Sequence, residues 1–215
     1  MLGRAIARVL PAVPRPVVRR LSARYIAGSE LAHAVRVVRA LNAGGKAATL
    51  DVLGEEVRRP EQAAAIVAEY LGALEAIERE RLDANVSVKP TAIALRLGRD
   101  AARGHLETLA RAAAGRGNFV RLDMEDSSTT SSTLALYREL RAEGLDNVGV
   151  VLRAGVKPEL ADALVREGRR VRVYVPYGRQ WYEYSLRRLQ ENPLVAGYVA
   201  SDLLRRVVPG SGRRA

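Results

Sequence analysis

Apolar positions recur along the chain at two alternating spacings. Leu31, Val35, Val38 and Leu41 follow one helical stripe, so we predict a helix over 29–42 with Ser29 as its N-cap. The stretch "AATLDVL" that follows is short and continuously apolar, as in a buried strand. A second helix is predicted over 61–79, and its inner face is formed by Ile66, Tyr70, Leu74 and Ile77.

The same alternation continues to the C-terminal part of the chain. Four more strands are predicted in "NVSVKPTAIAL", "NFVRLDMED", "NVGVVLRAG" and "RVRVYVPYG". Four more helices are predicted over 99–114, "LALYRELRAEG", "PELADALVREG" and 180–191. The run "SSTTSST" is interpreted as a polar connection whose last members cap the following helix. Pro90 cannot donate to a sheet, so the second strand is expected to stop near Lys89.

Five alternations of strand and helix predict an α/β fold with parallel strands. Both an open doubly wound sheet and part of a (β/α)₈ barrel fit this pattern. An open nucleotide-binding sheet usually carries a Gly-rich turn after its first strand, whereas the turn here reads "DVLGEE". Its two acids would repel a pyrophosphate, which favours barrel units with functional groups at the carboxyl ends of the strands.

Charged and polar residues follow these strand ends. Asp51, Lys89, Asp123, Arg153 and the region 174–177 would share one rim if the ends converge. The adjacent Arg187 and Arg188 lie on the helix after the last strand, and guanidinium groups bind carboxylates through paired hydrogen bonds. This suggests a site for a small anionic ligand, in which Asp123 orients Lys89 or Tyr174. The alternative is that each charge is a solvated loop residue or a local ion pair.

Composition and motif content exclude several other kinds of functional site. The chain has no cysteine, and its two histidines, His33 and His105, lie far apart in predicted helices without metal-ligand spacing. No apolar run is long enough to cross a bilayer, and no P-loop is present. We therefore expect a cytoplasmic protein, with peripheral contact at the inner face of the plasma membrane as a further expectation.

The chain is strongly basic, with a formal net charge of +11. A basic surface suits nucleic acid, anionic lipid or acidic small molecules, but a genome that favours arginine codons would give the same excess. Residues 1–28 are interpreted as a basic helical segment, 29–206 as the barrel domain, and 207–215 as a disordered tail. No nucleic-acid partner is expected.

Long stretches of the chain resemble the bacterial monofunctional proline dehydrogenases. The matching segments include "ARYIAGSELAHAVRVVRALNAGGKAATLDVLGEEV", "LDANVSVKPTA", "NFVRLDMEDS" and "EGRRVRVYVPYGRQWYEYSLRRLQENP". The resemblance implies a (β/α)₈ barrel holding FAD. It also implies oxidation of L-proline to 1-pyrroline-5-carboxylate by hydride transfer to the flavin, with membrane quinone as the electron acceptor.

The resemblance also assigns residues. Lys89, Arg187 and Arg188 are similar to the family residues that hold the substrate carboxylate, and Tyr174 to a tyrosine beside the proline ring. Asp123 matches a rim aspartate, and Glu191 an acid that supports the arginines.

The chain departs from the family pattern after "NVGVVL". Arg153 stands where the family has glutamine, and the family segments Arg-Val-Lys-Gly and Thr-His, which contact FAD, are absent. Segments of strands 5 to 7 are missing, on the order of 90 residues against a usual barrel of about 250. We expect an incomplete barrel with about five parallel strands and little bound FAD. A fragment that retains the carboxylate clamp without activity is one alternative, and a basic surface-binding protein is another. Open sheet edges would favour self-association.

Overall fold

The computed structural model describes residues 18–19, 22, 25–54, 57–123, 125, 127–151, 166 and 172–191. Side-chain positions are described within these ranges except at 127, 151, 172–173 and 187–191. The chain divides into two compact units, one formed by Ala27–Arg179 and the other by Met1–Ile26 together with Gln180–Ala215.

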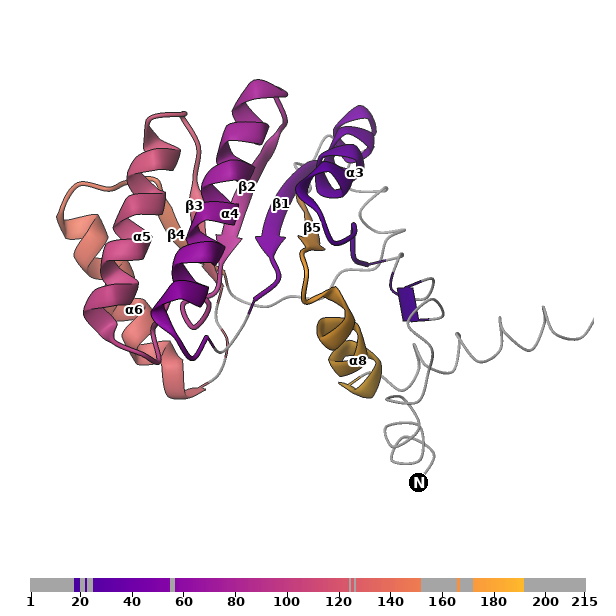
Figure 1. Cartoon of the computed structure of the whole chain (residues 1–215). Coiled ribbons are helices and arrows are strands. Elements are labelled where there is room, and N and C mark those ends of the chain that lie inside the picture. Colours follow the sequence, from indigo (N-terminus) through magenta and orange to yellow (C-terminus); the bar gives the residue numbers. More distant parts are fainter. Residues whose placement is uncertain are drawn as a thin grey trace, which may run out of the picture. The chain divides into compact units, whose positions relative to one another are not determined.

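The first unit is built on a five-stranded sheet in which every neighbouring pair is parallel (Figure 1). Its strands are β1 (Ala47–Val52), β2 (Ala84–Val88), β3 (Val120–Asp123), β4 (Val148–Val151) and β5 (Arg172–Tyr177). Their spatial order is β4-β3-β2-β1-β5, so the last strand of the chain pairs with the first. This confirms the prediction of an α/β fold with five parallel strands.

Helices alternate with the strands along the chain and form one layer against the sheet. They are α3 (Leu31–Ala43), α4 (Pro60–Arg79), α5 (Arg99–Ala114) and α6 (Ser127–Ala142). Successive helices contact each other, and Figure 1 shows α4, α5 and α6 on the same side of the sheet. Sequential packing on one face is the arrangement of (β/α) barrel units and differs from a doubly wound sheet, which has helices on both faces.

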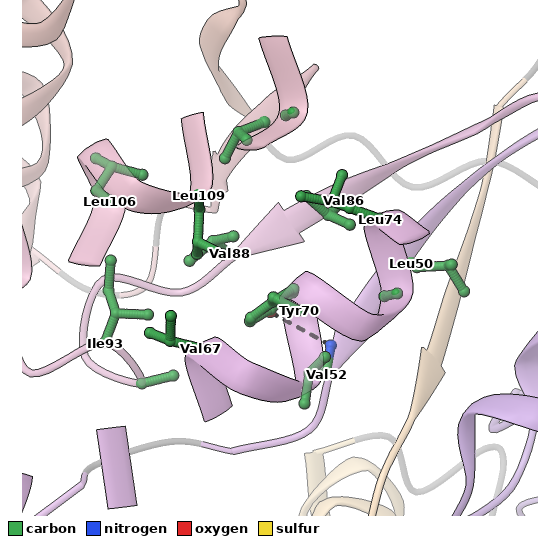
Figure 2. Packing of buried hydrophobic residues seen from close by; sticks show 14 of the residues in the cluster. Leu50, Val52, Val67, Tyr70, Leu74, Val86, Val88, Ile93, Leu106 and Leu109 are labelled. Atoms are coloured by element: carbon green, nitrogen blue, oxygen red, sulfur yellow. Dashed lines mark hydrogen bonds between the residues drawn. The ribbon is translucent and has the colours of Figure 1, made fainter. Parts of the chain in front are cut away.

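The two faces of the strands differ in chemistry. Side chains that point toward the helices are apolar and form the core, for example Leu50, Val86 and Val88 (Figure 2). Successive residues of a strand point to opposite faces, and the opposite face of β1 and β2 carries the polar side chains of Thr49, Asp51, Asn85 and Ser87. The register places Thr49 beside Asn85 and Asp51 beside Ser87, so the polar positions form rows across the sheet.

The exit of β5 is fixed by close backbone packing. The Leu53 N–H donates to the Tyr177 carbonyl at 2.7 Å, and the Gly178 N–H donates to the Gly28 carbonyl at 2.9 Å. Gly178 has φ +134°, and a Cβ atom there would lie 3.1 Å from the Leu53 nitrogen. Glycine is therefore required at this position.

The Ser/Thr run is helical, so its interpretation as a connection was wrong. Helix α6 begins at Ser127 and contains the whole run. Thr129 and Thr133 are buried, and the Thr133 hydroxyl donates to the Thr129 carbonyl at 2.9 Å. This i−4 bond satisfies the hydroxyl inside a helix, which composition alone does not reveal.

The other element boundaries agree with the sequence to within a few residues. The N-cap of α3 is Glu30, one residue later than predicted, and α5 has the predicted bounds. The second unit contains α8 (Trp181–Glu191), where the Trp181 and Tyr182 rings meet edge to face at 5.7 Å between centroids. The predicted helix "PELADALVREG" lies outside the described residues except for Arg166, which is helical. Most of the segment 1–28 and all of the tail 207–215 also lie outside them.

Candidate functional site

The carboxyl ends of β1 and β2 bring an acidic and a basic side chain together. Asp51, the penultimate residue of β1, is fully buried, and Lys89, which directly follows β2, is 6% exposed. The Lys89 Nζ atom lies 2.7 Å from both Asp51 Oδ1 and Oδ2. A charge pair of this kind is stable in a buried position only when it is also hydrogen-bonded, as it is here.

Two further side chains complete this cluster. The Tyr174 hydroxyl, from β5, donates to Asp51 Oδ2 at 2.6 Å and accepts from Lys89 Nζ at 3.3 Å. Asp123, the last residue of β3, has its Oδ2 atom 3.9 Å from Lys89 Nζ. We call Asp51, Lys89, Asp123 and Tyr174 the carboxyl-edge cluster. Its four members come from β1, β3 and β5 and from the exit of β2.

Tyr174 presents an open aromatic ring beside this buried pair. The side chain is 41% exposed although its hydroxyl is hydrogen-bonded, and Lys89 Nζ lies 5.9 Å from the ring centroid. The ring can therefore pack against a small ligand, while the hydroxyl holds Asp51.

Glu125 fixes the turn that follows Lys89. Its carboxylate accepts from the Thr91 N–H at 2.9 Å and from the Thr91 hydroxyl at 2.5 Å. This links the exit of β3 to residues 90–97 and holds the backbone of the turn in place. The role of Glu125 was not predicted, because an acid that accepts from a distant backbone group leaves no pattern in the local sequence.

The structure unites part of the predicted site. Lys89, at the exit of β2, and Asp123, at the end of β3, lie together as expected for strand ends, and Tyr174 joins them from within β5. The closest partner of both Lys89 and Tyr174 is Asp51, whereas the sequence had suggested Asp123 for that role. The side chains of Arg187, Arg188 and Glu191, which belong to α8, lie outside the described positions, as does Arg153.

The charge balance of the cluster differs from the expected cationic site. One ammonium meets two carboxylates, so the positive charge of Lys89 is already compensated within the cluster. Attraction of an anion would then depend on groups beyond the cluster, whereas the two carboxylates suit a ligand ammonium group.

Tyr70 approaches the same cluster from the helix side. It is completely buried on α4, and its hydroxyl lies 3.4 Å from Asp51 Oδ1. Burial, followed by the charge of Asp51, raises the pKa of the Tyr70 phenol well above its ordinary value. The phenol therefore stays neutral at any physiological pH.

Other site types find no support in the described part of the chain. No group of three or more histidine, cysteine, aspartate or glutamate side chains could hold a metal ion among the described residues. His105 faces the Ile93 carbonyl, with its Nδ1 atom at 3.1 Å. Among the described helices, none has the length and apolarity needed to cross a membrane.

A parallel sheet with helices on one face and a polar cluster at the carboxyl ends of its strands defines a (β/α)-barrel type of protein. The sequence profile of the proline dehydrogenase family matches residues 34–157. The chain belongs to this family.

Individual relatives support the assignment along most of the chain. Proline dehydrogenase 1 of Bacillus subtilis subsp. natto is 26% identical over 279 positions, which cover 87% of this chain and 92% of that protein. Proline dehydrogenase of Deinococcus radiodurans is 23% identical over 300 positions, covering 92% of this chain and 97% of that protein. Both alignments are longer than the 215-residue chain, so the relatives contain positions that face no residue here.

The fold has a counterpart among solved structures. Proline utilization A from Bdellovibrio bacteriovorus, inactivated by N-propargylglycine, superposes with a TM-score of 0.63 at 15% identity. The match covers 85% of this chain and 34% of that one. The similarity shows a shared barrel-like fold and supports the prediction of an incomplete (β/α)₈ architecture.

Proposed function

We propose that the chain binds L-proline at the carboxyl-edge cluster and oxidises it to 1-pyrroline-5-carboxylate. Membership of the proline dehydrogenase family supports proline oxidation as the chemistry. The observation that carries the proposal is the junction of Asp51, Lys89 and Tyr174 at 2.6–3.3 Å. It joins side chains of three neighbouring strands into one polar site beside an open aromatic ring.

Proline is a zwitterion, and both of its charges have candidate partners. In the proposal, the secondary ammonium faces the carboxylates of Asp51 and Asp123, and the ring packs against Tyr174. The carboxylate is held by Arg187 and Arg188 beside Lys89, as the family resemblance implies, and Glu191 supports the two arginines. Oxidation transfers a hydride from a ring carbon to a two-electron acceptor, for which the family resemblance implies FAD, and releases a proton from nitrogen, so that a C=N bond is left.

The electron acceptor belongs to the same proposal. The family resemblance implies FAD, followed by membrane quinone with peripheral contact to the membrane. The carboxyl-edge cluster does not fit the pyrophosphate of FAD, because it holds two carboxylates against one ammonium. The family segments that contact FAD are also absent from the sequence. We therefore assign no chemical step to the flavin.

A second candidate function follows from this mismatch. The chain would bind proline without oxidising it, as a shortened family member that keeps the substrate site. The relatives' extra aligned positions favour this candidate, because the chain is shorter than the proteins that it matches.

One experiment separates the two candidates. Purified protein is supplied with FAD, L-proline and a reducible dye, and the rate is compared between wild type, Lys89→Met and the control Lys46→Met. Proline-dependent reduction that is lost only in Lys89→Met supports oxidation. Absence of reduction combined with proline binding by calorimetry supports the second candidate.

Ligand fragments then show which half of proline is held. Pyrrolidine carries the ammonium without the carboxylate, and cyclopentanecarboxylate carries the carboxylate without the ammonium. If neither fragment binds and proline itself does not bind, both candidates are overturned.

A further inference from the structure

Tyr70 places a phenol hydroxyl between two neighbouring strands. Its ring packs in the core with Val67 and Leu74 of the same helix, and its side chain reaches the carboxyl ends of β1 and β2 (Figure 2). The hydroxyl accepts from the Val52 N–H at 3.3 Å and donates to the Ser87 carbonyl at 2.6 Å. A helix side chain thus bonds to both strands at once.

These two backbone groups are the donor and the acceptor that a continued ladder between β1 and β2 would pair. The pairing of β1 with β2 starts with the Ala48 N–H, which donates to the Asp83 carbonyl at 2.9 Å. Bonds in a parallel pair are evenly spaced and advance by two residues on each strand. Two such steps lead from Ala48 to Val52 and from Asp83 to Ser87. The Tyr70 hydroxyl therefore occupies the position of a ladder bond and bridges its donor and its acceptor.

This position lies directly behind the carboxyl-edge cluster. Asp51 precedes Val52 and is the register partner of Ser87. Its Oδ1 atom lies 3.4 Å from the Tyr70 oxygen and 2.7 Å from Lys89 Nζ. Because the phenol has a single proton and the Ser87 carbonyl is the nearer acceptor, the Asp51 carboxylate keeps its strong bonds for Lys89 and Tyr174.

We propose that Tyr70 is a positioning residue, whose hydroxyl holds β1 and β2 apart at their carboxyl ends and thereby sets Asp51 opposite Lys89. Without the hydroxyl, the two strands would close to restore the direct ladder bond, or both backbone groups would lose a partner in the core. Either change moves Asp51 relative to Lys89. This inference concerns the cluster itself and does not depend on the proposed reaction.

The Tyr70→Phe variant tests the proposal, because it keeps the ring and removes only the hydroxyl. The chain's lysines are Lys46, Lys89 and Lys157, so the ammonium signals in a ¹⁵N-labelled sample are few. The Lys89 ammonium is buried and hydrogen-bonded and should give a slowly exchanging signal, which Lys89→Arg identifies by its loss. In Tyr70→Phe we expect this signal to shift and to broaden or disappear through faster exchange.

Tyr137→Phe is the matched control. Tyr137 lies on α6, is partly buried and packs against the same core. Its variant should leave the Lys89 signal unchanged. A folded Tyr70→Phe protein with an unchanged Lys89 signal would overturn the proposal, and so would an equal effect from Tyr137→Phe.

A second measurement uses the wild-type protein and does not require the variant to fold. A hydroxyl proton held between Val52 and Ser87 should exchange slowly and show a nuclear Overhauser effect to the Val52 amide proton. A folded wild-type protein in which the Tyr70 hydroxyl proton exchanges with water as fast as an exposed phenol would contradict the bridge.

Discussion

Lys89 directs its ammonium group at both carboxylate oxygens of Asp51, with each N–O distance at 2.7 Å. The two residues are 38 positions apart in the sequence and meet because β1 and β2 are parallel neighbours. Parallel pairing places the carboxyl ends of both strands at the same edge, so the ion pair follows directly from the topology.

Removal of one partner of the Asp51–Lys89 pair should strongly destabilise the folded protein. In Asp51→Asn, Lys89 keeps a buried charge without its main counter-ion, and we expect a loss of about 3–5 kcal/mol in the free energy of unfolding. Urea denaturation at pH 7 measures this loss. Asp146→Asn is the control, because it breaks the exposed pair with Arg141, whose 2.7 Å contact involves an aspartate side chain that is 81% exposed. Equal losses in the two variants would show that the Asp51–Lys89 pair is not buried as described.

Removal of both Asp51 and Lys89 should lower the free energy of unfolding by less than the sum of the two single losses. Asp51→Asn and Lys89→Met each leave one buried group without its partner, whereas the double variant leaves neither charge. We expect a coupling free energy of about 1–3 kcal/mol in a double-mutant cycle. The four proteins are compared by urea unfolding under one buffer condition. Additive losses would mean that the two side chains do not interact in solution.

Stability should fall in alkaline solution because of two buried phenols. Burial, and then the charges of Glu69 and Asp51, raise the pKa of Tyr177, and burial with the charge of Asp51 raises that of Tyr70. The unfolded chain loses these protons near pH 10, whereas the folded chain retains them. The stabilisation is therefore complete below about pH 10 and is lost as pH rises toward the folded pKa values, by up to about 1.4 kcal/mol per pH unit for each group.

Urea unfolding measured from about pH 9 to about pH 11.5, a range that brackets the ordinary titration of tyrosine, gives this slope. Tyr70→Phe and Tyr177→Phe should each flatten it, because each removes one group that ionises only on unfolding. A slope that both variants leave unchanged would assign the alkaline loss to other groups.

Two glycines should respond to alanine in opposite directions. At Gly178, φ is +134° and the new methyl group would crowd the Leu53 backbone, so we expect a loss of about 1–3 kcal/mol. At Gly104, in helix α5, nothing lies within 4 Å of the added carbon, and alanine should stabilise by about 0.5–1 kcal/mol. Thermal unfolding of the two variants should give melting temperatures on opposite sides of the wild-type value.

Much of the fold was predictable because its determinants are local. The helical stripe of Ile66, Tyr70, Leu74 and Ile77 identified the buried face of α4, and all four residues are in the core. The short apolar runs between the helices predicted the strands of the parallel sheet. The Ser/Thr run was misread because the hydroxyl bonds that satisfy it inside a helix depend on where that helix packs.

Part of the carboxyl-edge cluster was predictable in membership but not in pairing. Lys89 and Asp123 were recognisable at strand ends and Tyr174 in the last strand, and the structure brings these three side chains together. Which acid binds Lys89 depends on the register between strands, and this made Asp51 the principal partner. The position of Tyr70 in a helical stripe predicted burial, but no spacing shows that its hydroxyl enters a ladder between two strands.

The strand order β4-β3-β2-β1-β5 leaves β4 and β5 at opposite borders of the sheet, although among the described residues no strand lies between them in sequence. Extra strands inserted between residues 151 and 172 would extend these borders toward each other without breaking any existing pairing. A graft of further strands at this place is therefore a topologically simple route to a closed cylinder, and a comparison of flavin binding before and after the graft measures what closure contributes.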